Sequence, residues 1–164
     1  MKSLSAGLLV GVLCCVVSAQ NPSQGMVAQN ISDLKLQPLP DAPTCFPAAV
    51  ERGDPARGAS IMIMRCSAGC YVPRHWHPAS EEIMMIRGTA DIGIKGEKPV
   101  KLAPGGFLAV PPHHVMDFSC TSESQLFLLT GGTFEIHYVN DAGNEISPQE
   151  ALATGRRSAA AKKK

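Results

Sequence analysis

Short apolar runs alternate with glycine and proline from about residue 45 to about residue 139. The runs are four to eight residues long, and turn-forming residues separate them. Such a texture is typical of antiparallel strands that form a sandwich or a barrel. It predicts about eight strands, at 60–66, 70–77, 82–87, 90–95, 107–110, 115–120, 125–130 and 133–139.

A helical pattern occurs only near the C-terminal end. Ser147 is a suitable N-cap and Pro148 a suitable first-turn residue, so we expect a short helix over 147–155 that stops at Gly155. The predicted fold class is therefore all-β, with one short C-terminal helix. Residues 156–164 lack apolar anchors, and we expect them to form a disordered basic tail.

The first nineteen residues have the organisation of a secretory signal peptide. Lys2 is basic, Leu8–Val17 is almost wholly apolar, and Val17-Ser18-Ala19 provides small residues for cleavage. The apolar run is too short to span a bilayer. We therefore expect an exported protein, secreted or periplasmic, with no membrane span. Residues 20–44 contain several prolines, which predicts an irregular leader before one folded domain at 45–146.

The charge of the folded body excludes one class of partner. Residues 20–155 carry nine lysine or arginine and fourteen aspartate or glutamate residues, a net charge of −5. A nucleic-acid-binding domain needs a basic face. We therefore expect no nucleic-acid partner.

Four cysteines remain after the predicted signal peptide: Cys45, Cys66, Cys70 and Cys120. An exported protein meets oxidising conditions, so disulfides are permitted, and three complete pairings are possible. No C-x-x-C pair exists, which disfavours a cysteine zinc site. Buried free thiols are the alternative, because cysteine is among the most buried residue types.

The candidate chemistry concentrates in His75-Trp76-His77 and Glu81. Residues two apart on a strand point to the same face, so His75 and His77 lie together and Trp76 faces away. Pro78-Ala79-Ser80 bends the chain, and Glu81 then opens the next strand. Two histidines and one carboxylate are a facial ligand set for a divalent metal ion, with positions left open for water, substrate or dioxygen.

These residues resemble the cupin superfamily. Gly69, His75, His77, Glu81 and Gly88 fall at every defined position of the first cupin motif. Gly105 and Pro111-Pro112 resemble the start of the second motif, where the family then has a glycine and a metal-binding histidine. In this chain those two positions hold His113 and Met116.

The resemblance implies a double-stranded β-helix, or jelly-roll barrel, with one mononuclear metal inside. The metal could be Fe, Mn, Zn, Ni or Cu, and its ligands would be His75, His77 and Glu81. A fourth ligand could be His114, which has the same strand parity as Met116, or Met116 itself. A thioether is a soft ligand that favours copper, and Met116 could instead only line the pocket. His113, in the usual glycine position, would need an uncommon backbone conformation.

In cupins the strand with the histidine pair lies beside the strand with the second motif, so the resemblance favours a Cys70–Cys120 disulfide. Strand parity disagrees, since Cys70 should point outward and Cys120 inward. A bulge after Gly69 could break the alternation.

Two functions remain open. Cupins include dioxygenases, isomerases and decarboxylases, so one hypothesis is a metal-dependent enzyme, dioxygenase-like, that acts on a small organic molecule; its catalytic residues are unknown. The alternative is a non-catalytic protein that binds a small ligand or the metal. We also expect a homodimer, because Met84 and Ile86 should point outward beside Met62 and Met64.

Overall fold

The computed structural model describes residues 26 and 28–161, so the predicted signal peptide and the last three residues lie outside the described residues. A 3₁₀ helix, η1, spans Ile31–Asp33, and one α-helix, α1, spans Pro148–Ala161. The described residues also form ten strands: β1 Ala48–Gly53, β2 Ser60–Cys66, β3 Tyr71–Trp76, β4 Glu81–Arg87, β5 Ala90–Ile94, β6 Val100–Leu102, β7 Phe107–Val110, β8 Met116–Cys120, β9 Ser124–Thr130 and β10 His137–Tyr138. Neither described helix is long and apolar enough to cross a membrane.

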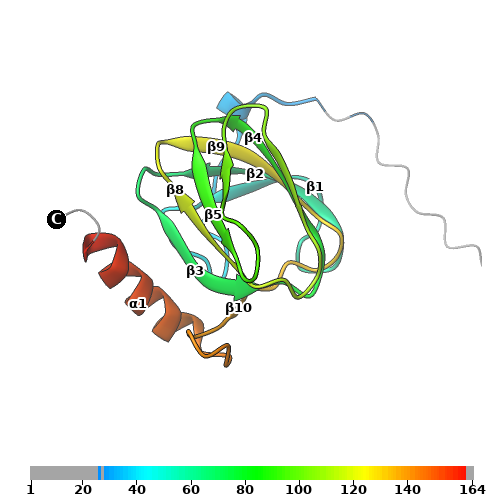
Figure 1. The fold of residues 1–164 in the computed structure, drawn as a ribbon. Helices are drawn as coiled ribbons and strands as arrows, with labels where there is room; N and C mark the ends of the chain where they lie inside the picture. Colours follow the sequence, from blue (N-terminus) through cyan, green and yellow to red (C-terminus); the bar gives the residue numbers. More distant parts are fainter. Residues whose placement is uncertain (1–25, 27, 162–164) are drawn as a thin grey trace, which may run out of the picture.

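The strands form two antiparallel sheets of five strands each, in the orders β1-β2-β9-β4-β7 and β10-β3-β8-β5-β6. Most neighbours within a sheet are distant in sequence; β9, for example, lies between β2 and β4. Figure 1 shows the two sheets wrapped around a common interior, with α1 outside β3. The architecture is a jelly-roll barrel, which confirms the all-β prediction.

Alternation along β4 sets which side chains enter the barrel. Glu81, Ile83 and Met85 are at most 3% exposed, whereas Met84 and Ile86 are each 36% exposed. The predicted directions of these side chains are therefore correct.

The expected outward position of Met62 and Met64 is wrong. Both are at most 2% exposed, because β2 pairs with β9 in a register that places Met62 opposite Leu128 and Met64 opposite Leu126. All four side chains belong to the core between the sheets.

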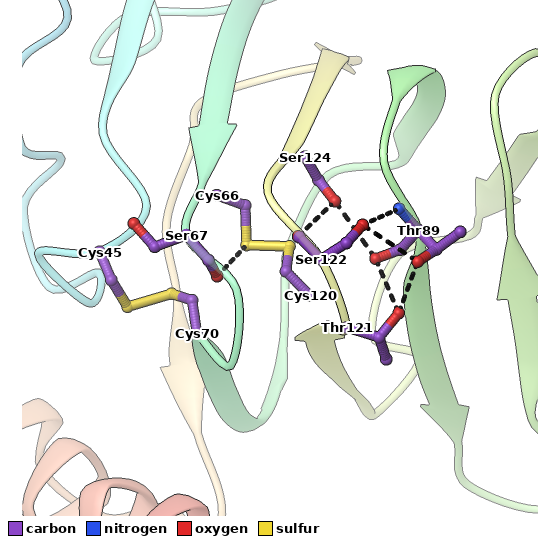
Figure 2. Close-up of a disulfide and its surroundings, with 9 residues drawn as sticks. All are labelled: Cys45, Cys66, Ser67, Cys70, Thr89, Cys120, Thr121, Ser122 and Ser124. Carbon is purple, nitrogen blue, oxygen red and sulfur yellow. Dashed lines mark hydrogen bonds between the residues drawn. A yellow bond between two sulfur atoms is a disulfide. The ribbon is translucent and has the colours of Figure 1, made fainter.

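All four cysteines of the described chain form disulfides, which Figure 2 shows: Cys45–Cys70 and Cys66–Cys120. The expected Cys70–Cys120 pair is wrong, although these two residues are neighbours across β3 and β8. The Cys120 N–H donates to the Cys70 carbonyl (3.0 Å), and the Gly69 N–H donates to the Cys120 carbonyl (2.7 Å). Gly69 has φ 79°, so this is a glycine bulge opposite Cys120. The Cys120 side chain enters the core and meets Cys66 of the other sheet, while Cys70 meets Cys45 of the leader.

The C-terminal helix starts where the sequence predicts and continues further. The Ser147 hydroxyl accepts a hydrogen bond from the Glu150 N–H (3.2 Å), as an N-cap should. The expected stop at Gly155 is wrong, because α1 runs to Ala161 and takes in the first part of the predicted tail. At Gly155 an added Cβ would lie 2.7 Å from Cγ of Pro73, so this glycine permits close packing of α1 on β3.

Candidate functional site

His75, His77 and Glu81 lie together in the interior of the barrel. His75 is on β3, His77 directly follows that strand, and Glu81 begins β4. The three residues are only 3%, 7% and 3% exposed. They line one cavity of about 40 Å³, whose other walls are apolar. The structure thus brings together the three residues that the sequence singled out.

Backbone carbonyls fix both imidazole rings. Nδ1 of His75 lies 2.7 Å from the Pro73 carbonyl oxygen, and Nδ1 of His77 lies 2.6 Å from the Glu135 carbonyl oxygen. Because a carbonyl can only accept, each Nδ1 carries the hydrogen and each Nε2 keeps its lone pair. This arrangement holds an imidazole ready to act as a ligand through Nε2.

Glu81 is the unsatisfied member of the group. Its Oε1 lies 3.3 Å from Nε2 of His77 but has no hydrogen-bond partner among the described residues. A buried polar atom without a partner costs about 1–3 kcal/mol, and more if it is charged. A cation or a hydrogen-bond donor beside Glu81 would satisfy this oxygen.

Burial shifts the pKa of all three groups toward the neutral form. It raises the pKa of Glu81 to about 8 and lowers the pKa of His75 to about 4. The pKa of His77 falls to about 3, mainly through burial and next through the neighbouring His75. At neutral pH the site without a bound cation holds two neutral imidazoles and a protonated carboxyl group.

Of the two candidates for a fourth ligand, Met116 borders the site. Met116 is 4% exposed, lines the cavity and pairs with His75 across β3 and β8. His114 is exposed and does not line the cavity, because β8 begins only at Met116 and His114 belongs to the turn before it. His113, in the glycine position of the motif, adopts φ 62°, the uncommon conformation that the sequence predicts.

Trp76 faces away from the cavity and forms an aromatic stack on the outer surface. The ring centroids of His137 and Trp76 are 4.0 Å apart, and the two rings are nearly parallel, with an interplanar angle of 10°. The centroid of the His113 ring lies 4.7 Å from that of Trp76, with the two rings tilted by 45°. His137 also lies 3.5 Å from a carboxylate oxygen of Glu135. His137 is therefore outside the site, as the alternation of residues 134–139 predicts.

Sequence reasoning missed the part that the leader plays at the site. Leu39 and Ala42 line the same cavity as the two histidines, and the Asp41 carbonyl accepts a hydrogen bond from the Tyr138 hydroxyl (2.7 Å). The only signal in the sequence is that Leu39 is an apolar residue between two prolines.

Among the residues that the structure describes, no three histidine, cysteine, aspartate or glutamate side chains have the mutual arrangement of a metal-binding group. The three candidates nevertheless border one cavity, and they come from adjacent segments of chain.

The comparisons with known proteins agree with this architecture. Residues 62–132 match the family model described as "Cupin domain", and this segment contains both motifs and the three clustered residues. The segment 62–132 is a cupin domain. No curated protein matches the chain significantly.

Solved structures extend the likeness beyond the matched segment. A polyketide cyclase, RemF, from Streptomyces resistomycificus is similar to this cupin with a TM-score of 0.62 at 16% identity, over 77% of this chain and 89% of its own. An RmlC-like cupin from Ralstonia eutropha gives 0.59 at 17% identity, over 82% and 87%. The DMSP lyase DddQ from Ruegeria pomeroyi gives 0.55 at 20% identity, over 69% and 64%. At these identities the likeness establishes the fold alone.

Proposed function

We propose that this cupin binds one divalent transition metal ion through His75, His77 and Glu81, and that the ion binds or transforms a small organic molecule. The observation that carries the proposal is the unsatisfied Oε1 of Glu81 beside two imidazoles whose Nδ1 atoms are already hydrogen-bonded. A cation would satisfy all three groups at once, so the donor set fits a metal such as Fe, Mn, Zn, Ni or Cu.

Such an ion, when bound, would supply Lewis-acid or redox chemistry at its open coordination positions. The chain would contribute orientation and exclusion of water. The Pro73 and Glu135 carbonyls hold the rings of His75 and His77, and Glu81 would release its proton when the ion binds.

Catalysis and simple binding both remain candidates. Two structural neighbours are named as enzymes, a lyase and a cyclase, which supports a catalytic function, and dioxygenase-like chemistry is one form of it. The cavity favours the alternative, a non-catalytic binder, in one respect. Among its described lining residues, no titratable side chain remains besides the three proposed ligands.

Metal analysis of purified protein tests the proposal. We expect about one divalent ion per chain, with occupancy lost in His75→Ala and in His77→Ala. His114→Ala is the matched control, because this exposed histidine is outside the cavity and should leave occupancy unchanged. Full occupancy in a protein that lacks both His75 and His77 would contradict the proposed site.

We propose that the protein is exported, either secreted or periplasmic. The two disulfides support this proposal, because disulfides persist in oxidising compartments. The mature chain should begin near Gln20, and mass spectrometry of the exported protein would test this. A mass that still includes Met1–Ala19 would contradict it.

We also propose a homodimer that forms through the outer face of the β1-β2-β9-β4-β7 sheet. The strand register aligns one apolar row across all five strands: Ala49, Ile63, Phe127, Met84 and Phe107. Met84 is 36% and Phe107 57% exposed, which supports an interaction surface on this face.

A further inference from the structure

The walls of the candidate site offer a ligand almost no polar contact. Apart from His75, His77 and Glu81, every described residue that lines the cavity has an aliphatic, aromatic or thioether side chain. None of them has a hydroxyl, amide, ammonium or guanidinium group. Arg74 and Lys95 line a separate hollow on the outside of the barrel, and Arg74 forms an ion pair there with Asp141 (3.4 Å).

The chemistry of the walls restricts what can enter. A sugar, amide or dicarboxylate would lose its hydration without gaining a partner on these walls, and such a loss is unfavourable. The available space restricts size as well, since the cavity is small, about 40 Å³. Only a molecule with one donor atom for the metal and a compact apolar remainder meets both conditions.

A short segment of the leader sets this limit on size. We call residues 38–46 the cap; its Leu39, Ala42 and Phe46 line the cavity. Backbone hydrogen bonds between Gln37 and Ala48 (2.8 and 2.9 Å) hold the cap at its two ends. The Cys45–Cys70 disulfide, on the left in Figure 2, fixes it to the start of β3.

A third contact connects the cap to the barrel beside the site. The Tyr138 hydroxyl donates to the Asp41 carbonyl (2.7 Å), and Tyr138 lies opposite His75 in the pairing of β10 with β3. Asp41 itself has φ 57°, in the left-handed region that aspartate adopts more readily than most residues, and this turns the cap at the contact. The cap is therefore held in one position over the cavity.

We infer that the ligand of this cupin is a small, uncharged and largely apolar molecule with a single metal-binding atom, and that the cap excludes larger ones. The inference rests on the proposed function only for that one polar contact, which the metal would provide. The wall chemistry and the cap act with or without the ion.

Methionine methyl groups report on occupancy directly. In protein labelled with [methyl-¹³C]methionine, Met64 and Met116 line the cavity and Met84 lies on the outer surface as an internal control. Acetone and acetamide have the same number of non-hydrogen atoms and differ by a methyl group in place of an amino group. They form a matched pair of probes for zinc-loaded protein.

We expect acetone to shift the Met64 and Met116 signals and leave Met84 unchanged. In zinc-loaded protein acetamide should bind at least about tenfold more weakly, because the ion then occupies the lone pairs of His75, His77 and Glu81 and the remaining walls offer the amino group no acceptor. Equal binding of the two probes, or an equal shift at Met84, would overturn the inference. Zinc content of the same samples reports separately on the metal site. A failure of zinc uptake contradicts the proposed function, while acetone binding and cyclohexanone exclusion in the zinc-free protein still test the cavity and the cap.

Cyclohexanone tests the cap. The intact protein should exclude it, and the double variant C45S/C70S should bind it at least about tenfold more tightly while keeping the preference for acetone over acetamide. Tyr138→Phe keeps both disulfides and provides a milder release if the double variant does not fold. The function assigned to the cap would be overturned if folded C45S/C70S protein still excluded cyclohexanone. If the double variant does not fold, the same result in Tyr138→Phe would overturn it.

Discussion

His75 and Met116 lie directly opposite each other across β3 and β8. This is the position from which the second cupin motif would bring a histidine to the metal, and here it carries a thioether. A soft sulfur ligand adds little affinity for Zn²⁺ or Ni²⁺ compared with an imidazole. The pair therefore explains why three candidate ligands, and not four, border the cavity.

Met116→His should strengthen binding of Zn²⁺ or Ni²⁺ by roughly tenfold or more, because it adds an imidazole beside the proposed ligands. Competition with a chromogenic chelator would measure the change. Met64→His is the control, since Met64 also lines the cavity but projects from β2 in the other sheet. If Met116→His brings no gain over Met64→His, Met116 is not next to the bound ion.

Glu81 should make the metal-free protein less stable as the pH rises. Its pKa is about 8 in the folded chain and 4.5 when unperturbed, so between these values the unfolded state loses its proton while the folded state keeps it. Each pH unit in this window lowers the free energy of unfolding by at most about 1.4 kcal/mol. Above about pH 8 both states are ionised and the decline stops.

Denaturant titrations of metal-free wild type and Glu81→Gln between pH 4.5 and 8 would isolate this effect. The titrations of His75 and His77 contribute to both proteins and cancel in the difference. We expect the wild type to lose stability relative to the glutamine variant across the window, and metal to restore it most at the alkaline end. A constant difference between the two proteins would show that Glu81 is not held in its neutral form.

The two disulfides should differ in how easily they are reduced. Cys66 and Cys120 are at most 1% exposed, whereas Cys45 is only half-buried and belongs to a leader that borders an open hollow. Accessible disulfides react first with a reductant. Stepwise reduction of the native protein, followed by differential alkylation and mass spectrometry, measures this order. We expect Cys45 and Cys70 to become free thiols before Cys66 and Cys120. The opposite order would contradict the assigned exposures.

Local patterns in the sequence are sufficient for most of the barrel. The alternation along β4 predicts that Glu81 and Ile83 point inward and Met84 outward, as observed. Two strands escape prediction: β1 is half polar because it lies at a sheet edge, and β6 has only three residues.

Features that depend on distant parts of the chain could not be predicted in the same way. Pairing of Cys120 with Cys66 depends on how two sheets face each other, which strand parity alone does not specify. The position of Leu39 over the site depends on the Cys45–Cys70 link and the bridge from Gln37 to Ala48. Gly155 resembles a helix end in the sequence, but α1 continues through it to Ala161, and the glycine instead lets the helix pack closely on Pro73.

The outer apolar row should hold two chains together. Met84 lies at the centre of the exposed part of the row, between Phe127 and Phe107 in register, so a charge at this position would be buried without a partner in the proposed dimer. Light scattering should report a dimer for the wild type. For Met84→Glu it should report a monomer, or a dimer whose association is weakened at least about tenfold. Val50→Glu is the matched control, because Val50 is 44% exposed but lies on β1 outside the row. A monomeric wild type at micromolar concentration would mean that this face remains exposed, and equal effects of the two substitutions would place the contact elsewhere.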